Sequence, residues 1–287
     1  DVYKRQDLHR KVRLAAILGT WQSTLTNFRY ISKQWKKNCE EERLLGVSLT
    51  GIMDSTLTNG KDDGLEERLE RLRDMAVETN KIHADRIGIP QSAAVTCVKP
   101  SGTVSQLVDS ASGIHARHNP YYIRTVRADK KDPLAKAMVE AQFPVEDDVM
   151  KPEHTYVFSF PMKADPGAVY RTDMTAIEQL ELWLKYQKHW CEHKPSVTIS
   201  VKEHEWMEVG AWVYSNWEWM SGVSFLPFSD HTYRQAPYQD CTEEEYEEFK
   251  KKMPESVNWS ELLAQFETSD MTEGAQELAC VAGNCEI

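Results

Sequence analysis

Two cysteines lie close together near the end of the chain, in the segment "QELACVAGNCEI". Cys280 and Cys285 are separated by four residues, which include Ala282 and Gly283. This spacing allows the two thiols to close into an intramolecular disulfide, the product of thiol–disulfide exchange. Two alternatives are a pair of ordinary surface thiols and half of a zinc site. Zinc needs about four ligands, and no Cys or His flanks the pair closely enough to supply the others, so we expect no metal here.

A second segment with chemical potential is the loop "KPSGTVSQLV", which follows a predicted strand and opens a predicted helix. Its proline ends the strand, its glycine frees the backbone for an unusual turn, and its hydroxyl groups fall in the first helical turn. Exposed amides and the positive helix end, about half an elementary charge, suit a phosphate group. The Walker spacing is absent, and the local chemistry alone favours an ordinary Ser/Thr cap. The residues concerned are Pro100, Ser101, Gly102, Thr103, Val104 and Ser105.

Composition limits the partners of these groups. The chain has 287 residues, with 34 Lys and Arg against 45 Asp and Glu, a formal net charge of −11. This acidic balance argues against binding to nucleic acid or to anionic lipid, because both require clustered positive charge. The sequence holds no apolar run of the roughly 18 to 20 residues that a membrane span needs, and no signal peptide. We therefore expect a cytoplasmic protein, in which six cysteines are too few for a disulfide scaffold.

The elements that must position these groups alternate between strand-like and helical patterns. Period-two or β-rich segments predict strands, and apolar residues at helical spacing predict helices. Strands separated by helices favour parallel pairing with the helices outside, hence an α/β sheet or barrel. The predicted strands cover residues 43–52, 92–98, 155–162, 196–201 and 222–227, and the longer predicted helices cover 62–90, 175–193 and 205–217.

Two of these helices carry recognisable end signals. In the first, Asp63 is the expected N-terminal cap, and Gly88 with Pro90 is expected to end the helix. In the second, Thr175 and Glu178 have the spacing of a capping box. The first helix should bury one apolar stripe, formed by Leu65, Leu69, Leu72, Ala76 and Ile87.

Several blocks, in order, resemble the C-terminal half of adenosylcobalamin-dependent (class II) ribonucleotide reductases of the ribonucleoside-triphosphate type. They are "NCEEERLLGVSLTGIMD", "KPSGTVSQLVDSASGIHARHNPYYIRTVR", "HKPSVTISVKEHEW", "GVSFLPFSDHTYRQAPYQ" and the terminal Cys-x4-Cys. The resemblance implies the second half of a ten-stranded α/β barrel over residues 7–237, a charged helical peripheral segment over 238–270 and a flexible redox tail over 271–287. Residues 1–6, "DVYKRQ", match the translation of a transposon end used in sequencing libraries, so we expect them to be an artefact joined to a truncated gene.

The resemblance also implies a role for each segment. The loop Pro100–Ser105 would hold the phosphates of a ribonucleoside triphosphate. Adenosylcobalamin would generate a thiyl radical, which converts the ribonucleotide to a 2′-deoxyribonucleotide for DNA synthesis while a cysteine pair becomes a disulfide. Cys280 and Cys285 would reduce that disulfide and then be reduced by thioredoxin or a similar protein. The family's radical-bearing Asn-x-Cys-x-Glu loop, its oxidised barrel cysteines and the region that binds deoxynucleotide effectors are missing, so we expect this fragment to be inactive alone.

Other conspicuous residues have structural explanations. We expect Cys39, Cys97, Cys191 and Cys241 to be structural, and the segment "TEEEYEEFKKK" to be a solvated helix. His115 and His118 lack an obvious partner and are expected on a polar surface loop. The tryptophans 183, 190, 206, 212, 217 and 219 are expected in the core.

Two other functions remain open from the sequence. The segment could belong to a class I-type ribonucleotide reductase large subunit that uses a separate metal subunit. It could also be a non-catalytic phosphate-binding module.

Overall fold

A computed structural model describes residues 2–228 and 233–266; Cys280 and Cys285 lie outside the described residues. The chain divides into two compact units. The first contains residues 1–117 and 167–228, and the second contains 118–166 and 229–287. Neither unit ends at residue 237, where the sequence suggested a change of domain.

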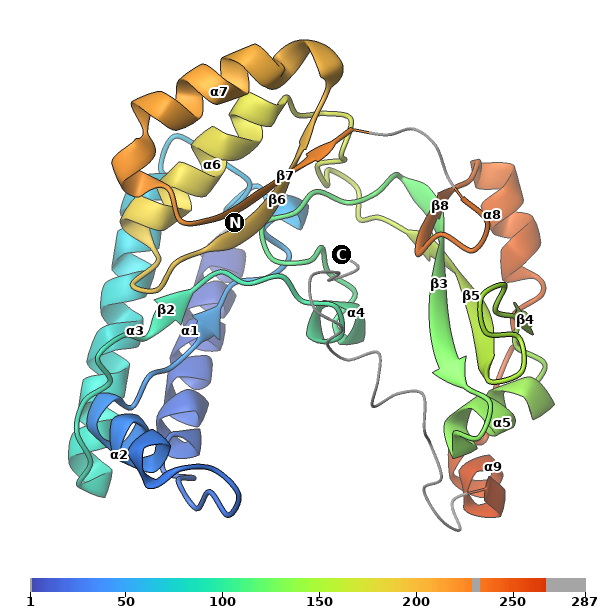
Figure 1. The fold of residues 1–287 in the computed structure, drawn as a ribbon, viewed down its shortest axis with the longest axis horizontal. Helices are drawn as coiled ribbons and strands as arrows, with labels where there is room; N and C mark the ends of the chain where they lie inside the picture. Colours follow the sequence, from blue (N-terminus) through green and yellow to red (C-terminus); the bar gives the residue numbers. More distant parts are fainter. Residues whose placement is uncertain (1, 229–232, 267–287) are drawn as a thin grey trace. The chain divides into compact units, whose positions relative to one another are not determined.

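The first unit combines helices with two small parallel sheets (Figure 1). Strand β1 (Val47–Ser48) pairs with β2 (Thr96–Cys97), and β6 (Ser196–Val201) pairs with β7 (Gly222–Pro227). The parallel pairing predicted for these segments is confirmed. The helices are α1 (Val2–Gln22), α2 (Lys33–Glu42), α3 (Leu65–Ile87), α4 (Val104–Leu107), α6 (Ala176–His189) and α7 (Trp206–Ser215), with short 3-10 turns η1 (Ile52–Asp54), η2 (Glu203–Glu205) and η3 (Trp217–Trp219).

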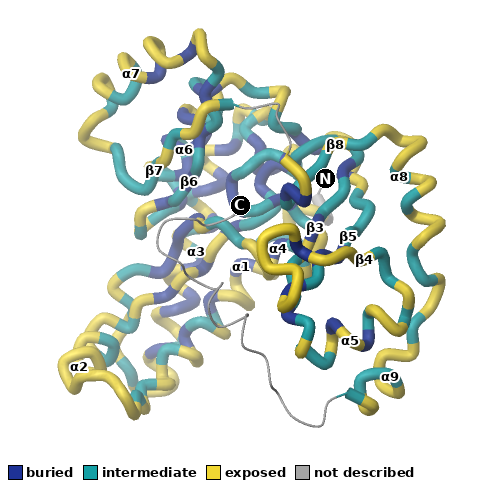
Figure 2. The backbone as a smooth tube through the Cα atoms, turned by 45° about the vertical axis from the view of Figure 1, so that its right-hand side comes forward, coloured by how far each residue is buried: buried dark blue, intermediate teal, exposed yellow. Residues whose placement is uncertain are grey.

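The core of this unit lies where α3 and α6 meet and where α6 lies against β6. Figure 2 shows buried residues concentrated along these elements, whereas α2 is largely exposed. Leu65, Leu69, Leu72 and Ala76 are all buried on α3, as their spacing predicts. Ile87 is 42% exposed, so its assignment to the stripe was wrong. It is the last residue of α3, where the helix already runs beyond the core.

The ends of α3 and α6 test the predicted caps. Gly64, rather than Asp63, is the cap residue of α3, and its amide donates to Asp62 Oδ1 at 2.9 Å. Gly88 ends α3 in the left-handed conformation, as predicted. The capping box at the start of α6 is present, with Thr175 and Glu178 satisfying each other's backbone amides.

The six tryptophans expected in the core fall into three groups. Trp212 is half-buried and packs against the core, in partial agreement with that expectation. Trp183 and Trp190 are completely buried, as expected for the core. Trp206, Trp217 and Trp219 are exposed by 40%, 72% and 39%, so the expectation that they lie in the core was wrong. They lie on α7 and η3, and only Val209 of α7 is buried.

The second unit is built on an antiparallel sheet in the order β4-β5-β3-β8. The prediction of parallel pairing was therefore wrong for the strand at 155–162. The sequence pattern also missed its partner β3, whose burial does not alternate regularly. The elements are β3 (Tyr121–Asp129), α5 (Pro133–Glu140), β4 (Val145–Asp147), β5 (Thr155–Lys163), β8 (Tyr238–Asp240), α8 (Glu243–Lys250) and α9 (Trp259–Phe266).

Helix α8 is the solvated helix expected from its charges, since none of its residues is buried. Residues 238–240, placed in the charged helical segment by the sequence, instead form β8 beside β3. The described sheets have two, four and two strands, so α/β content is confirmed but half of a ten-stranded barrel is not. None of the described helices is long and apolar enough to span a membrane.

Candidate functional site: the loop after strand β2

The loop at Pro100–Ser105 leaves the end of β2 and is stabilised mainly by serine side chains. The Ser101 amide donates to Ser112 Oγ at 2.8 Å, and the Ser105 amide donates to Ser101 Oγ at 2.9 Å. The buried Ser105 hydroxyl donates to the Ser101 carbonyl. Thr103 is the residue before α4, but its side chain makes no capping bond. The sequence therefore located the turn correctly, and the Ser/Thr cap that its local chemistry favours is present, formed by Ser101.

Three consecutive amides, those of Gly102, Thr103 and Val104, have no hydrogen-bond acceptor among the described residues. All three residues are exposed. A Cβ built on Gly102 would contact no described atom within 4 Å, and the φ of this residue is outside the left-handed region. The sequence suggested that the turn needs a glycine here, and that suggestion was wrong. Helix α4 has only four residues, which limits its dipole. The anion-binding potential of the loop therefore comes from its exposed amides.

Gly113 is the glycine that this region requires. Its φ is +54°, and a Cβ added there would lie 2.7 Å from the Lys99 carbonyl oxygen. The Lys99 ammonium is held by the Lys194 carbonyl at 2.6 Å and by Ser196 Oγ at 2.9 Å. The return of the chain at Gly113 therefore packs directly against the start of the loop.

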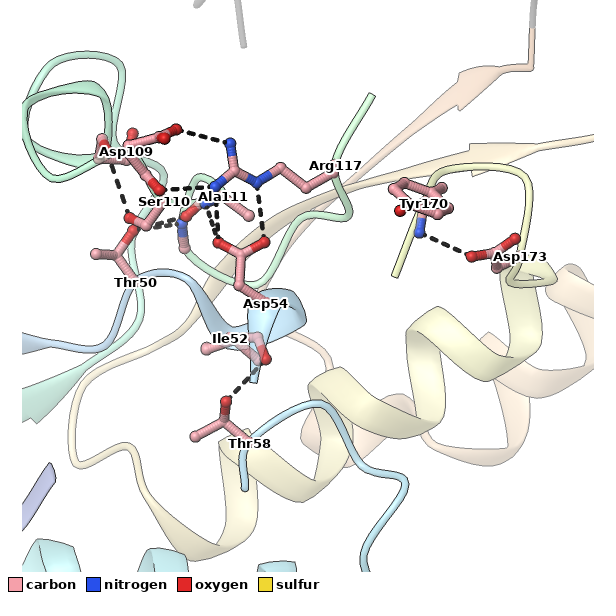
Figure 3. A network of polar contacts seen from close by, with 12 residues as sticks. Thr50, Ile52, Asp54, Thr58, Asp109, Ser110, Ala111, Arg117, Tyr170 and Asp173 are labelled. Carbon is pink, nitrogen blue, oxygen red and sulfur yellow. Dashed lines mark hydrogen bonds and ion pairs between the residues drawn. The ribbon is translucent and has the colours of Figure 1, made fainter. Parts of the chain in front are cut away.

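An ion network around the buried Arg117 anchors the far side of the loop (Figure 3). Arg117, only 4% exposed, donates from Nε to Asp54 Oδ1 at 2.9 Å and from Nη2 to Asp54 Oδ2 at 3.2 Å. The same guanidinium donates to the Asp109 carbonyl at 2.7 Å and to its carboxylate at 3.2 Å. The Ala111 amide donates to Asp54 Oδ2 at 2.7 Å. Arg117 thus connects η1, through Asp54, to Asp109 in the chain that follows the loop.

Thr50 adds a second connection between the same two segments. Its hydroxyl donates to the Ala111 carbonyl at 2.9 Å and accepts from the Gly113 amide at 3.0 Å. The Gly51 amide also donates to the Ala111 carbonyl, at 2.8 Å. Sequence reasoning missed this support, because Thr50 and Asp54 precede Ala111 by about sixty residues and only the shared family blocks hinted at their importance.

The two histidines of "GIHARH" are not on a polar surface loop, so that expectation was wrong. His115 is part of the first unit and largely buried, and burial lowers the pKa of its imidazole below the ordinary value of 6.5. His118 belongs to the second unit, where its Nε2 lies 2.7 Å from Asp240 Oδ1 and its ring stacks on Tyr238. Each histidine therefore has a partner that the sequence did not reveal.

The described cysteines are all free thiols. Burial raises the pKa of Cys97, and burial is also the main reason for the strongly raised pKa of Cys191. Burial, with nearby acidic groups, raises the pKa of Cys241. Since the thiolate is the reactive form, these cysteines are poor nucleophiles, in agreement with a structural role.

Comparisons with known proteins connect the chain to one group of enzymes, although no family model matches it. A 257-residue match, 30% identical, covers 88% of the chain and 35% of the adenosylcobalamin-dependent ribonucleoside-triphosphate reductase of Euglena gracilis. The corresponding Lactobacillus leichmannii reductase is 26% identical over 86% of the chain and 37% of its own length. The solved structure of a B-12 dependent (class II) ribonucleotide reductase matches with a TM-score of 0.75 and 23% identity, over 92% of this chain and 40% of that one.

The structural likeness shows that the chain shares a fold with a ribonucleotide reductase, and the sequence matches show that it is similar to reductases of that family. More particularly, these matched relatives are adenosylcobalamin-dependent ribonucleoside-triphosphate reductases. The resemblance seen in its motifs is thereby confirmed. The chain spans about a third of the length of the curated relatives that it matches.

Proposed function

We propose that this chain forms part of a ribonucleoside-triphosphate reductase and that its loop at Pro100–Ser105 binds the phosphates of the substrate. The observation that carries the proposal is the run of three exposed amides at residues 102–104 without acceptors among the described residues. Amides in such a run bind phosphate oxygens, as they do in other phosphate-binding loops. The names of the matched relatives supply the substrate class, a ribonucleoside triphosphate.

The rigid support of the loop favours this assignment. Arg117 and Thr50 hold the chain that returns from the loop, and Ser101 and Ser105 fix its beginning. The amides at 102–104 are therefore held in place before any ligand arrives. A preorganised set of donors binds an anion more tightly than a mobile one, because less conformational entropy is lost on binding.

Cys280 and Cys285 are proposed to supply reducing equivalents. Reduction of a ribonucleotide removes its 2′ hydroxyl as water and takes two electrons from a dithiol, which becomes a disulfide. The Cys280–Cys285 dithiol would reduce that disulfide by thiol–disulfide exchange and become a disulfide itself. Thioredoxin or a similar dithiol protein would then restore the two thiols.

Adenosylcobalamin, which the relatives' names contain, would supply the radical that starts the reaction. The described residues hold no group of three or more His, Cys, Asp and Glu side chains that could bind a metal directly. This is compatible with cobalamin, whose corrin ring holds its own cobalt, and we assign no residue of the chain to the corrin. Control by deoxynucleotide effectors and a cytoplasmic location complete the proposal.

The activity is tested on the full-length gene product that contains this chain. The purified protein is given one ribonucleoside triphosphate and a small dithiol, with and without adenosylcobalamin, and deoxynucleotide is measured. We expect product only with the cofactor. Product formed only after a metal-containing subunit is added would assign the chain to a class I-type reductase. Binding of triphosphate without product under any condition would indicate a phosphate-binding module.

The thiol assignment is tested in the same protein with Cys280→Ser and Cys285→Ser together. We expect turnover with thioredoxin to be lost and turnover with a small dithiol to be retained, because a small reductant can reach the active-site disulfide unaided. The matched control is Cys39→Ser, which removes a thiol outside the proposed pair and should leave both activities unchanged. Normal turnover of the double variant with thioredoxin would contradict the shuttle.

A further inference from the structure

One edge of strand β6 is hydrogen-bonded first to the segment that follows β2 and then, where that segment turns away, to a histidine side chain. The Ser196 amide donates to the Val98 carbonyl at 2.9 Å, which is a backbone partner. The next amide on the same edge, that of Thr198, donates to Nε2 of His115 at 3.0 Å. The chain that could have supplied another carbonyl has left β6 at Pro100 to form the loop. The imidazole of His115 thus satisfies an amide that the departing chain no longer serves.

The other nitrogen of His115 points to the loop itself. Nδ1 lies 3.0 Å from the Ser112 carbonyl, and Ser112 Oγ accepts from the Ser101 amide at 2.8 Å. Because the Thr198 amide can only donate and the Ser112 carbonyl can only accept, His115 must carry its proton on Nδ1 and none on Nε2. A continuous series of hydrogen bonds therefore runs from β6 through His115 and Ser112 to Ser101.

This series acts on Ser112, which the ion network does not contact directly. Asp54 and Thr50 hold Ala111, and Thr50 also holds Gly113, on either side of Ser112. The Ser112 carbonyl accepts from the His115 backbone amide at 2.9 Å as well as from the imidazole, and only the imidazole extends this contact to β6. The Ser112 hydroxyl accepts from the first amide of the loop. Ser101 in turn caps Ser105. The position of the three exposed amides is thereby connected to β6.

We propose that His115 is a positioning residue for triphosphate binding, which fixes the exposed amides of the loop relative to β6 without contacting the ligand. The inference rests on the proposed function, because it assumes that the loop binds phosphate. His115 and Ser112 act together in this proposal, because both are needed to connect the loop to β6. The two residues should therefore show coupled rather than additive effects when they are substituted.

The test measures binding of inorganic tripolyphosphate to the 287-residue chain by calorimetry. His115→Leu and Ser112→Ala should each weaken binding about fivefold, the loss of roughly one hydrogen bond's contribution of about 1 kcal/mol. The double variant should bind within about twofold of the weaker single variant, since both substitutions interrupt the same series. The matched control His118→Leu replaces the other histidine of "GIHARH", in the second unit, and should bind as the parent does.

Kinetics of the full-length gene product distinguish positioning from catalysis. His115→Leu should raise KM for the triphosphate about fivefold and leave kcat within about twofold, because the lost interaction serves substrate and transition state equally. His115→Gln should recover part of the loss, since its side-chain carbonyl can accept from the Thr198 amide. An unchanged KM for His115→Leu would contradict a positioning role.

Three results separate failure of this inference from failure of the proposed function. If Gly102→Asp, which puts a carboxylate in the loop, weakens binding and His115→Leu does not, the loop binds phosphate and the inference is overturned. If Gly102→Asp has no effect, the phosphate site itself is wrong. If His115→Leu does not fold, the tautomer decides, measured on the parent chain by nitrogen NMR of the imidazole. A proton on Nδ1 supports the inference, and a proton on Nε2 overturns it.

Discussion

Substitution of Gly102 offers the sharpest test of the phosphate loop, because the backbone there accepts a side chain. Its φ is outside the left-handed region and a Cβ would contact no described atom within 4 Å. Gly102→Asp therefore adds a carboxylate beside the exposed amides, and Gly102→Asn adds nearly the same shape without charge. Any difference between the two variants reports electrostatics rather than folding.

The size of that difference follows from Coulomb's law. A side chain at Gly102 places its carboxylate about 5 Å from a phosphate held by the neighbouring amides, given that adjacent Cα atoms are about 3.8 Å apart. At this distance one pair of unit charges repels by about 0.8 kcal/mol in bulk water and by about 3 kcal/mol at an effective dielectric constant of about 20. The loop is exposed, so we expect about 1–2 kcal/mol, or roughly five- to thirtyfold weaker binding.

Calorimetry with tripolyphosphate at low and high salt provides the assay. We expect Gly102→Asn to stay within about threefold of the parent chain, and the gap between the variants to narrow in high salt, because the Debye length falls from about 10 Å at 0.1 M to about 3 Å at 1 M. Equal weakening by Asp and Asn would show that the glycine matters for backbone shape. No weakening by either would refute phosphate binding at this loop.

Three further predictions concern the supports of the loop. Arg117→Met leaves the carboxylate of Asp54 buried without its cation and should lower the free energy of unfolding in urea by about 3 kcal/mol, while Arg117→Lys, which lacks the forked geometry, should recover only part. Gly113→Ala should cost about 2 kcal/mol more than Gly88→Ala, because both have positive φ but only Gly113 has a backbone oxygen 2.7 Å from the added Cβ. Burial lowers the pKa of His115 below 6.5, so the neutral imidazole contributes to stability above pH 6.5 and this contribution is lost as pH falls through the folded-state pKa. The midpoint of urea unfolding should therefore fall with acidification, and His115→Gln should make that fall less steep.

Local sequence patterns predicted the elements whose signals are contained within a few residues. The capping box of α6 and the left-handed Gly88 at the end of α3 are such cases. The antiparallel sheet was missed because strand direction depends on contacts between distant segments. Strand β3, for example, pairs with β5 and with β8, which begins more than a hundred residues later.

The tryptophans show a different reason for failure. Trp183 and Trp217 are the same residue type in segments with similar helical patterns, yet one is fully buried and the other is 72% exposed. Aromatic content indicates that a surface is apolar, but it does not say whether another element covers that surface. Trp183 is covered by a segment that includes Pro195, whose carbonyl accepts the indole N–H of Trp183. Pro195 lies twelve residues further along the chain, and no helical periodicity predicts this contact.

The loop combines both situations. Its residue types and its position after a strand predicted a turn with exposed amides, because amide availability is a local property of a turn, but only the family resemblance assigned phosphate to it. The precision of such a site depends on what prevents the turn from moving, and here those groups are Asp54, Arg117 and the imidazole of His115. The three come from separate segments and were not predicted as partners. The turn that we propose as a phosphate loop can therefore be located from sequence, whereas the strength of any binding there has to be sought in the residues that hold it.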